Sequence, residues 1–131
     1  MTPAKQVEAL MKKPTAVAFK ATNSQGRPLH YPWADIVYEV GVVVMNPKGH
    51  DPTRSEPCSY GLNLAVMDYL RRIYDASFIR LFVVEFDTAS KNVCIPFYSD
   101  GMFRVTQCKV IAEVTDVAAA FDPDWSYKGA H

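Results

Sequence analysis

The alternation of apolar and polar residues predicts a fold that combines strands with helices. Five segments have the two-residue period or the apolar length of a β-strand, namely 15–22, 36–45, 78–86, 92–98 and 102–114. The last two are joined by Ser99-Asp100-Gly101, in which Asp-Gly is a strong hairpin signal. A mostly antiparallel sheet is therefore expected.

Two other segments have helical spacing. In 62–74 the apolar residues recur every three or four positions, on a stripe formed by Leu62, Val66, Tyr69 and Ile73. A shorter helix is predicted over 2–13, where Thr2 can cap the first turn and Pro14 ends the pattern. The predicted fold class is α+β, with a mostly antiparallel sheet of about five strands, one packed central helix and a short N-terminal helix.

The length of 131 residues and the hydrophobic content of 49% fit one globular domain over 1–131. We divide it into an N-terminal helix at 1–14, an α+β core at 15–116 and an acidic and aromatic tail at 117–131. No apolar run approaches the roughly 20 residues of a membrane-spanning helix. We therefore expect no membrane contact and a cytoplasmic location.

The charge balance changes which partners are expected. The 14 basic residues equal the 14 acidic ones, which disfavours nonspecific nucleic-acid binding. Residues 1–30 hold five basic residues against Glu8 alone, whereas 111–131 hold four acidic residues against Lys128 alone, so a local charged contact surface remains compatible with neutrality. The cysteines and histidines are dispersed without the spacing of a zinc site, so no metal and no cofactor are expected.

Two loops carry the candidate binding residues. The segment 46–60 contains three prolines, and a loop of this length exceeds the usual connection of about 4–6 residues and is often functional. The shorter segment 28–33 is rich in large side chains held extended by two prolines. Histidine, arginine and aromatic side chains on loops are frequent binding groups, and here they are His30, Tyr31, Trp33, His50, Arg54 and Tyr60.

Two further constellations have catalytic counterparts in enzymes. Cys58 lies a few residues before the predicted 62–74 helix, whose N-terminus would stabilise a thiolate. Glu85, Asp87 and Glu113 lie near strand ends, and paired carboxylates serve hydrolytic reactions. Neither has the partner motif that its chemistry requires, so no catalytic residue is assigned and a non-enzymatic function is favoured.

Several short segments follow one another in a characteristic order: 19–22, a turn at Gly26, 38–41, Cys58 followed by Gly61-Leu62, 80–85 and 103–110. Over residues 17–114 this order resembles a small domain of unknown function that is common in phage and prophage proteins. That family often has a histidine after its Gly-Leu step, where this chain has Asn63, so an activity that uses the histidine is in doubt here. The resemblance implies a phage accessory protein in the cytoplasm of a bacterial host.

Three functional hypotheses follow. The first, by analogy with phage proteins, is a protein-binding module that inhibits a host protein, such as a defence component, through the two loops. The second is an enzyme of the ADP-ribosyltransferase type that processes a nucleotide or NAD between the same loops and the sheet. The third is a structural protein that self-associates through an exposed sheet edge.

Overall fold

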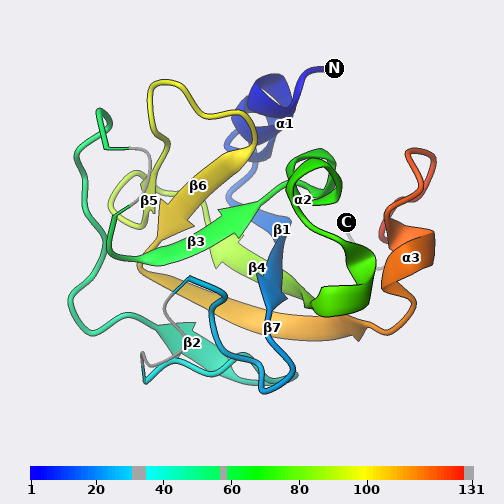
Figure 1. Cartoon of the computed structure of the whole chain (residues 1–131). Helices are drawn as coiled ribbons and strands as arrows, with labels where there is room; N and C mark the ends of the chain where they lie inside the picture. Colours follow the sequence, from blue (N-terminus) through cyan, green and yellow to red (C-terminus); the bar gives the residue numbers. More distant parts are fainter. Residues whose placement is uncertain (31–34, 57–58, 129–131) are drawn as a thin grey trace.

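The computed structural model describes residues 1–30, 35–56 and 59–128. Its elements follow in the order α1 (Pro3–Leu10), β1 (Thr15–Thr22), β2 (Val43–Met45), β3 (Leu62–Ala65), α2 (Met67–Ile73), a 3₁₀ turn (Ala76–Phe78), β4 (Arg80–Asp87), β5 (Val93–Cys94), β6 (Met102–Val105), β7 (Gln107–Val114) and α3 (Val117–Ala120). The strands form a seven-stranded sheet in the order β2-β7-β4-β1-β3-β6-β5, in which neighbours are antiparallel (Figure 1). The predicted α+β class and the antiparallel sheet are confirmed.

The predicted number of five strands is wrong, and the segment 62–74 gives one of the two additional strands. Leu62–Ala65 forms β3, which pairs with β6 along its whole length, and helix α2 begins only at Met67. Leu62 and Leu64 also fit a two-residue period, and both are buried in the sheet interior. Residues 62–65, which the sequence pattern predicts as the first turn of the helix, therefore form a strand because pairing with β6 outweighs their helical spacing.

The second additional strand arises because the segment 102–114 divides at Thr106 into β6 and β7. Four strand spacings separate these two strands in the sheet order, which in a flat sheet would place them about 19 Å apart. The step from Val105 to Gln107 spans at most about 7 Å of chain. The sheet must therefore curl so that β6 runs directly into β7.

Two predicted strands are shorter in the structure than in the sequence pattern. Of 36–45 only Val43–Met45 forms a strand, because the preceding chain turns at Gly41, where φ is +90°. Of 92–98 only Val93–Cys94 pairs, and Pro96 lacks the N–H that a longer ladder would need. Both short strands lie at the edges of the sheet.

Curling separates the apolar core into two clusters. The inner cluster fills the concave side and includes Val7 of α1, Phe82 of β4 and Phe103 of β6. The outer cluster lies beneath α2 and α3 and includes Leu70 and Leu81. In the predicted tail, Trp125 packs edge-on against Phe19 of β1 with ring centroids 5.9 Å apart, which attaches this segment to the outer cluster.

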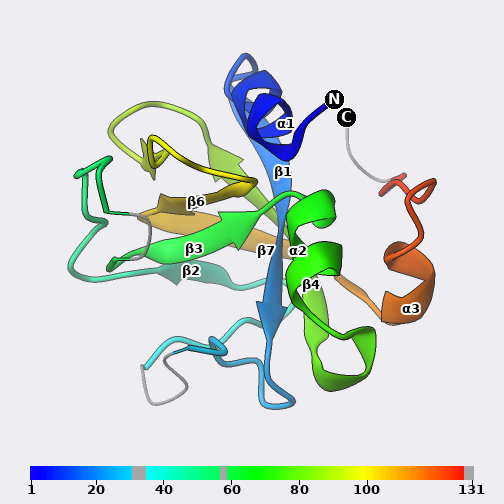
Figure 2. The same cartoon turned by 45° about the horizontal axis from the view of Figure 1, so that its top comes forward.

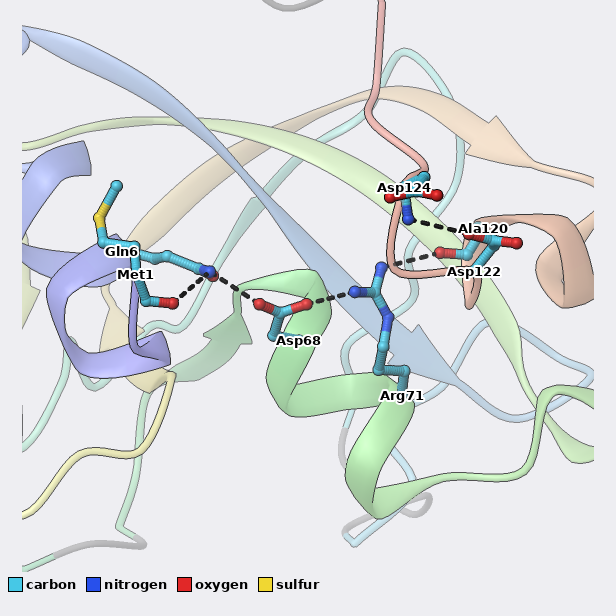
Figure 3. A network of polar contacts seen from close by, with 7 residues as sticks. All are labelled: Met1, Gln6, Asp68, Arg71, Ala120, Asp122 and Asp124. Atoms are coloured by element: carbon cyan, nitrogen blue, oxygen red, sulfur yellow. Dashed lines mark hydrogen bonds and ion pairs between the residues drawn. The ribbon is translucent and has the colours of Figure 1, made fainter.

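A polar network joins the helices across the outer face (Figure 3). Gln6 of α1 donates to the Asp68 carboxylate at 2.7 Å, and Arg71 forms an ion pair with the same carboxylate. The Arg71 guanidinium also donates to the carbonyl oxygen of Ala120 in α3 at 3.2 Å. Helix α2 is thereby held between the first and the last helix of the chain.

The long loop 46–60 is held in place by the guanidinium of Arg104, which is fully buried. Its nitrogens donate to three backbone carbonyl oxygens of this loop, with distances of 2.7 Å to Asp51, 2.6 Å to Thr53 and 2.8 Å to Glu56. Ser59 and the Thr53 N–H donate to the Asp51 carboxylate, and these hydrogen bonds lower the pKa of Asp51 to about 2. A planar fork of donors thus satisfies backbone groups that the loop itself leaves unpaired.

We expect Arg104→Lys to destabilise the protein by about 2–4 kcal/mol, because an ammonium keeps the charge but not the fork and leaves buried carbonyls without donors. Urea unfolding measures this loss, and limited proteolysis should cut faster within 51–56. The matched control is Arg54→Lys, since Arg54 is exposed and its guanidinium donates to the Ile95 carbonyl at 2.8 Å rather than to buried carbonyl oxygens of the loop. Equal stability of the wild type and Arg104→Lys would contradict the role of Arg104.

Candidate functional site

A cleft lies where strands β1 and β3 separate. β1 pairs with β4 along all eight of its residues, but with β3 only at Phe19↔Ala65. Beyond this pair the two strands diverge, and Figure 2 shows them crossing at a wide angle. The gap opens into a cavity of about 1000 Å³, at the upper end of the range in which proteins hold small ligands.

The walls of the cleft come from elements far apart in the sequence. Helix α2 supplies Tyr69 and Leu70, with Tyr74 directly after it, and the turns at 28–30, 46–48 and 59–61 form the rim. The lining includes Lys20 and Leu64, which follow the alternation of the inner face, as well as Phe19 and Ala65 from the outer cluster. The cleft therefore passes from one side of the split sheet toward the other.

Lys20 places an amine in this cleft. It alternates with Ala16 and Ala18 on β1, so its side chain points to the inner face, where apolar residues are expected. Its Nζ donates to the backbone carbonyl of Asn63 across the gap at 2.8 Å and lies 5.5 Å from the centre of the Tyr38 ring. Desolvation by burial lowers the pKa of Lys20 to about 8, although the nearby Cys108 opposes this shift.

Tyr38 brings a hydroxyl to the same cleft. Its side chain is almost completely buried, and among the described residues its Oη has no hydrogen-bond partner. The Tyr38 N–H donates to the Gly26 carbonyl at 2.8 Å, and a Cβ at Gly26 would lie only 2.6 Å from the Tyr38 carbonyl oxygen. Glycine at position 26 therefore permits the close backbone approach that positions Tyr38. Burial raises the pKa of Tyr38 well above 10, so the hydroxyl stays protonated.

Asn63 supplies a third polar group. Its side-chain amide donates to the Ser59 carbonyl at 3.4 Å, and its Oδ1 is buried with no partner in the described parts of the chain. Lys20, Tyr38 and Asn63 thus all belong to the lining of one cavity, and the Tyr38 Oη and the Asn63 Oδ1 are enclosed within its wall. Buried polar groups that lack partners are costly unless a ligand or water satisfies them, so this arrangement is suited to binding a polar molecule.

Two of the residues predicted from the sequence, His30 and Tyr60, line the rim of the cleft. His30 Nε2 lies 3.2 Å from the hydroxyl of Tyr74 at the end of α2, and Tyr60 is half exposed. Tyr31 and Trp33 lie outside the described residues, as does Cys58. The structure therefore brings together part of the predicted set and adds Lys20, Tyr38 and Asn63.

His50 and Arg54 lie away from the lining of the cleft. His50 Nδ1 is 2.8 Å from the Thr106 hydroxyl, and its Cβ packs where a Cβ of Gly61 would stand. Desolvation and the charge of Arg104 lower the pKa of His50. Arg54 lies over the ring of Phe97, with 4.4 Å from its Cζ to the ring centre. Both side chains support the loops on which they occur.

The predicted carboxylate group is not assembled as a hydrolytic pair. Glu113 accepts two hydrogen bonds from Arg80, at 2.7 and 2.9 Å, which lower its pKa, while Glu85 is exposed opposite Lys109. Within 1–30, 35–56 and 59–128, no three His, Cys, Asp or Glu side chains gather as a metal ion would require. Across these same ranges, no helix has both the length and the apolarity to cross a membrane.

One sequence signal could have identified Lys20. The predicted strand 15–22 alternates, and Lys20 occupies the face that Ala16 and Ala18 share, which a buried inner surface would reserve for apolar residues. A lysine at such a position indicates either an ion pair or a functional amine. The positions of Tyr38 and Asn63 beside it required the tertiary structure.

We expect Lys20→Met to be more stable than the wild type at pH 7, because the wild type buries a charged amine. The folded-state pKa of about 8 lies below the usual 10.5, so between these values the unfolded chain binds more protons and wild-type stability gains with pH. As the pH rises through this window, the difference in unfolding free energy between Lys20→Met and the wild type should shrink by at most about 1.4 kcal/mol per pH unit. Urea unfolding from pH 7 to 10 measures it, with the exposed Lys109→Met as the control, and a pH-independent difference would contradict the assignment.

Comparisons of the chain with protein-family models, with curated proteins and with solved structures found no match. The resemblance to a phage domain stays a prediction. The cleft at the β1–β3 split and the polar residues Lys20, Tyr38 and Asn63 in its lining are therefore the features that bear on function.

Proposed function

We propose that the protein binds a small organic ligand in the cleft, with a polar head directed at Lys20. The observation that carries this proposal is a half-buried amine in a cavity of about 1000 Å³ with no carboxylate paired to it among the described residues. Burying such an amine lowers the stability of the folded protein, so its presence suggests a functional role. Titratable groups with shifted pKa values are frequent in the clefts of functional sites. An oxygen atom of a ligand would give the amine an acceptor in addition to the Asn63 carbonyl.

The rim indicates the rest of the ligand. His30, Tyr60 and Tyr74 contribute three rings to the lining, and a planar ring of a ligand can stack on rings of this kind. Lys48 adds a positive charge to the same lining. A planar ring together with an anionic or carbonyl oxygen is the chemistry of a nucleotide. The cleft therefore favours the hypothesis of a nucleotide or NAD ligand. The proposed function is binding alone and does not require that the protein catalyse a reaction of the ligand.

We expect NAD, ADP-ribose or a cyclic nucleotide to raise the melting temperature of the wild type, because a ligand that binds only the folded state stabilises it. Lys20→Met should weaken this binding at least tenfold, while the exposed Lys109→Met should bind as the wild type does. A thermal-shift titration measures both effects. Absence of any shift would contradict the nucleotide class, and unchanged binding by Lys20→Met would place the ligand elsewhere.

A second candidate function, the phage-type protein-binding module, is favoured by a different surface. Phe97 and Tyr98 follow β5 with 61% and 96% of their surface exposed, and Arg54 stacks on Phe97. Exposed aromatic and arginine side chains are typical anchors of protein interfaces. This surface includes the predicted Arg54 and lies apart from the lining of the cleft.

If this surface binds a host protein, affinity capture from bacterial lysate with the wild type should recover a stoichiometric partner. The double variant Phe97→Ala and Tyr98→Ala should lose it, because such anchors contribute about 2 kcal/mol or more each. Lys20→Met serves as the control, since it leaves this surface intact. Capture that the double variant retains would exclude these residues as the contact.

A further inference from the structure

We propose that Lys20 captures the carbonyl group of a ligand in the cleft as a reversible imine. The inference rests on the proposed ligand-binding function and narrows the head group to an aldehyde or ketone, which ADP-ribose has in its open-chain form and which NAD and cyclic nucleotides lack.

The surroundings of Lys20 differ from those of a structural lysine. Such a residue usually pairs with a carboxylate or extends its ammonium into water. The three ion pairs found in the described parts of the chain all use arginine, and Lys20 instead turns inward to donate to the Asn63 carbonyl. Its neighbours are the ring of Tyr38 and the buried thiol of Cys108. The carbonyl and the ring favour an ammonium, but desolvation by burial outweighs them, since no carboxylate among the described residues pairs with Lys20.

Imine formation needs the neutral amine, and burial raises the fraction of Lys20 in that form. With a pKa of about 8, Lys20 holds about 300-fold more neutral amine at pH 7 than a lysine with the usual value of 10.5. Desolvation in an apolar pocket is one of the ways in which proteins activate lysine as a nucleophile. The thiol of Cys108 does not compete, because burial raises its pKa to about 12.

The reaction balances without an oxidant or reductant. The lone pair of Lys20 Nζ forms a bond to the carbonyl carbon, and the carbonyl oxygen takes up a proton to give a carbinolamine. Loss of water from the carbinolamine then leaves a C=N bond. Tyr38 belongs to the lining of the same cavity, and its hydroxyl stays protonated and lacks a partner among the described residues. Because this hydroxyl is enclosed in the cavity wall, it can donate a hydrogen bond to the reacting oxygen only after the wall shifts to expose it.

The chain contains its own reference groups. The other seven lysines are all exposed, at positions 5, 12, 13, 48, 91, 109 and 128, whereas Lys20 is half-buried. A carbonyl reagent that reacts only according to exposure would label these seven first. If the reagent instead labels Lys20 first, accessibility cannot explain the result. The label then reports the higher reactivity of the Lys20 amine.

The test uses pyridoxal 5′-phosphate, which combines a flat ring, an anionic group and an aldehyde. Treatment of the folded protein with a substoichiometric amount, reduction with borohydride and peptide mapping should place at least ten times more label on Lys20 than on any exposed lysine. Lys20→Arg should abolish this label, Tyr38→Phe should slow it several-fold, and Lys109→Arg should leave it unchanged. Circular dichroism establishes that each variant is folded.

Pyridoxine 5′-phosphate, which has an alcohol where the probe has its aldehyde, separates capture from binding. If it binds the cleft while Lys20 is labelled no faster than the exposed lysines, the imine is excluded and the ligand-binding function stands. If it does not bind, the aldehyde labels lysines by exposure alone and none of the nucleotides raises the melting temperature, both proposals fail. Selective labelling of Lys20 that Tyr38→Phe does not slow would retain the imine and remove Tyr38 from it.

Discussion

The single residue between β6 and β7 forces the sheet to curl, and the cleft depends on that constraint. Because Val105 and Gln107 lie on strands that are four places apart in the sheet order, the sheet must close toward itself there. β3 follows β6 in this curve, whereas β1 stays paired with β4 along its length. β1 and β3 therefore run in different directions, and they pair at a single position, Phe19↔Ala65, before they separate.

The separation of β1 from β3 changes the hydrogen bonding of the polar groups on either side of the gap. Backbone groups along a separated strand lose the ladder partners that they would have in a continuous sheet. Across this gap the Asn63 carbonyl finds a substitute donor in the Lys20 amine, which also places a lysine on a face built for apolar residues. The free energy that this lysine costs the fold is the kind of local strain that proteins tolerate at binding sites.

Arg104 connects the β6–β7 region to the loop 46–60 through hydrogen bonds. It precedes the β6–β7 step by two residues, and its three hydrogen bonds organise Asp51, Thr53 and Glu56 over the inner end of β6. The Asp51 N–H in turn donates to the Tyr60 carbonyl at 2.9 Å, next to the start of β3. The loop is therefore long because it must reach a buried guanidinium and then return to form one wall of the cleft.

The sequence by itself determined the local elements, the mixed class and the antiparallel character of the sheet, because period, capping residues and prolines act within a few positions of the chain. It placed β1 at its observed bounds, and it predicted a loop over 46–60, of which the described residues 46–56 and 59–60 lie outside helices and strands. It also selected His30 and Tyr60, which line the rim of the cleft. Only the tertiary structure decided that 62–65 is a strand, that Thr106 divides two strands, and that Lys20, Tyr38 and Asn63 share a cavity. Those outcomes depend on pairing and burial between residues distant in the chain, and no local pattern encodes which strand a segment will meet.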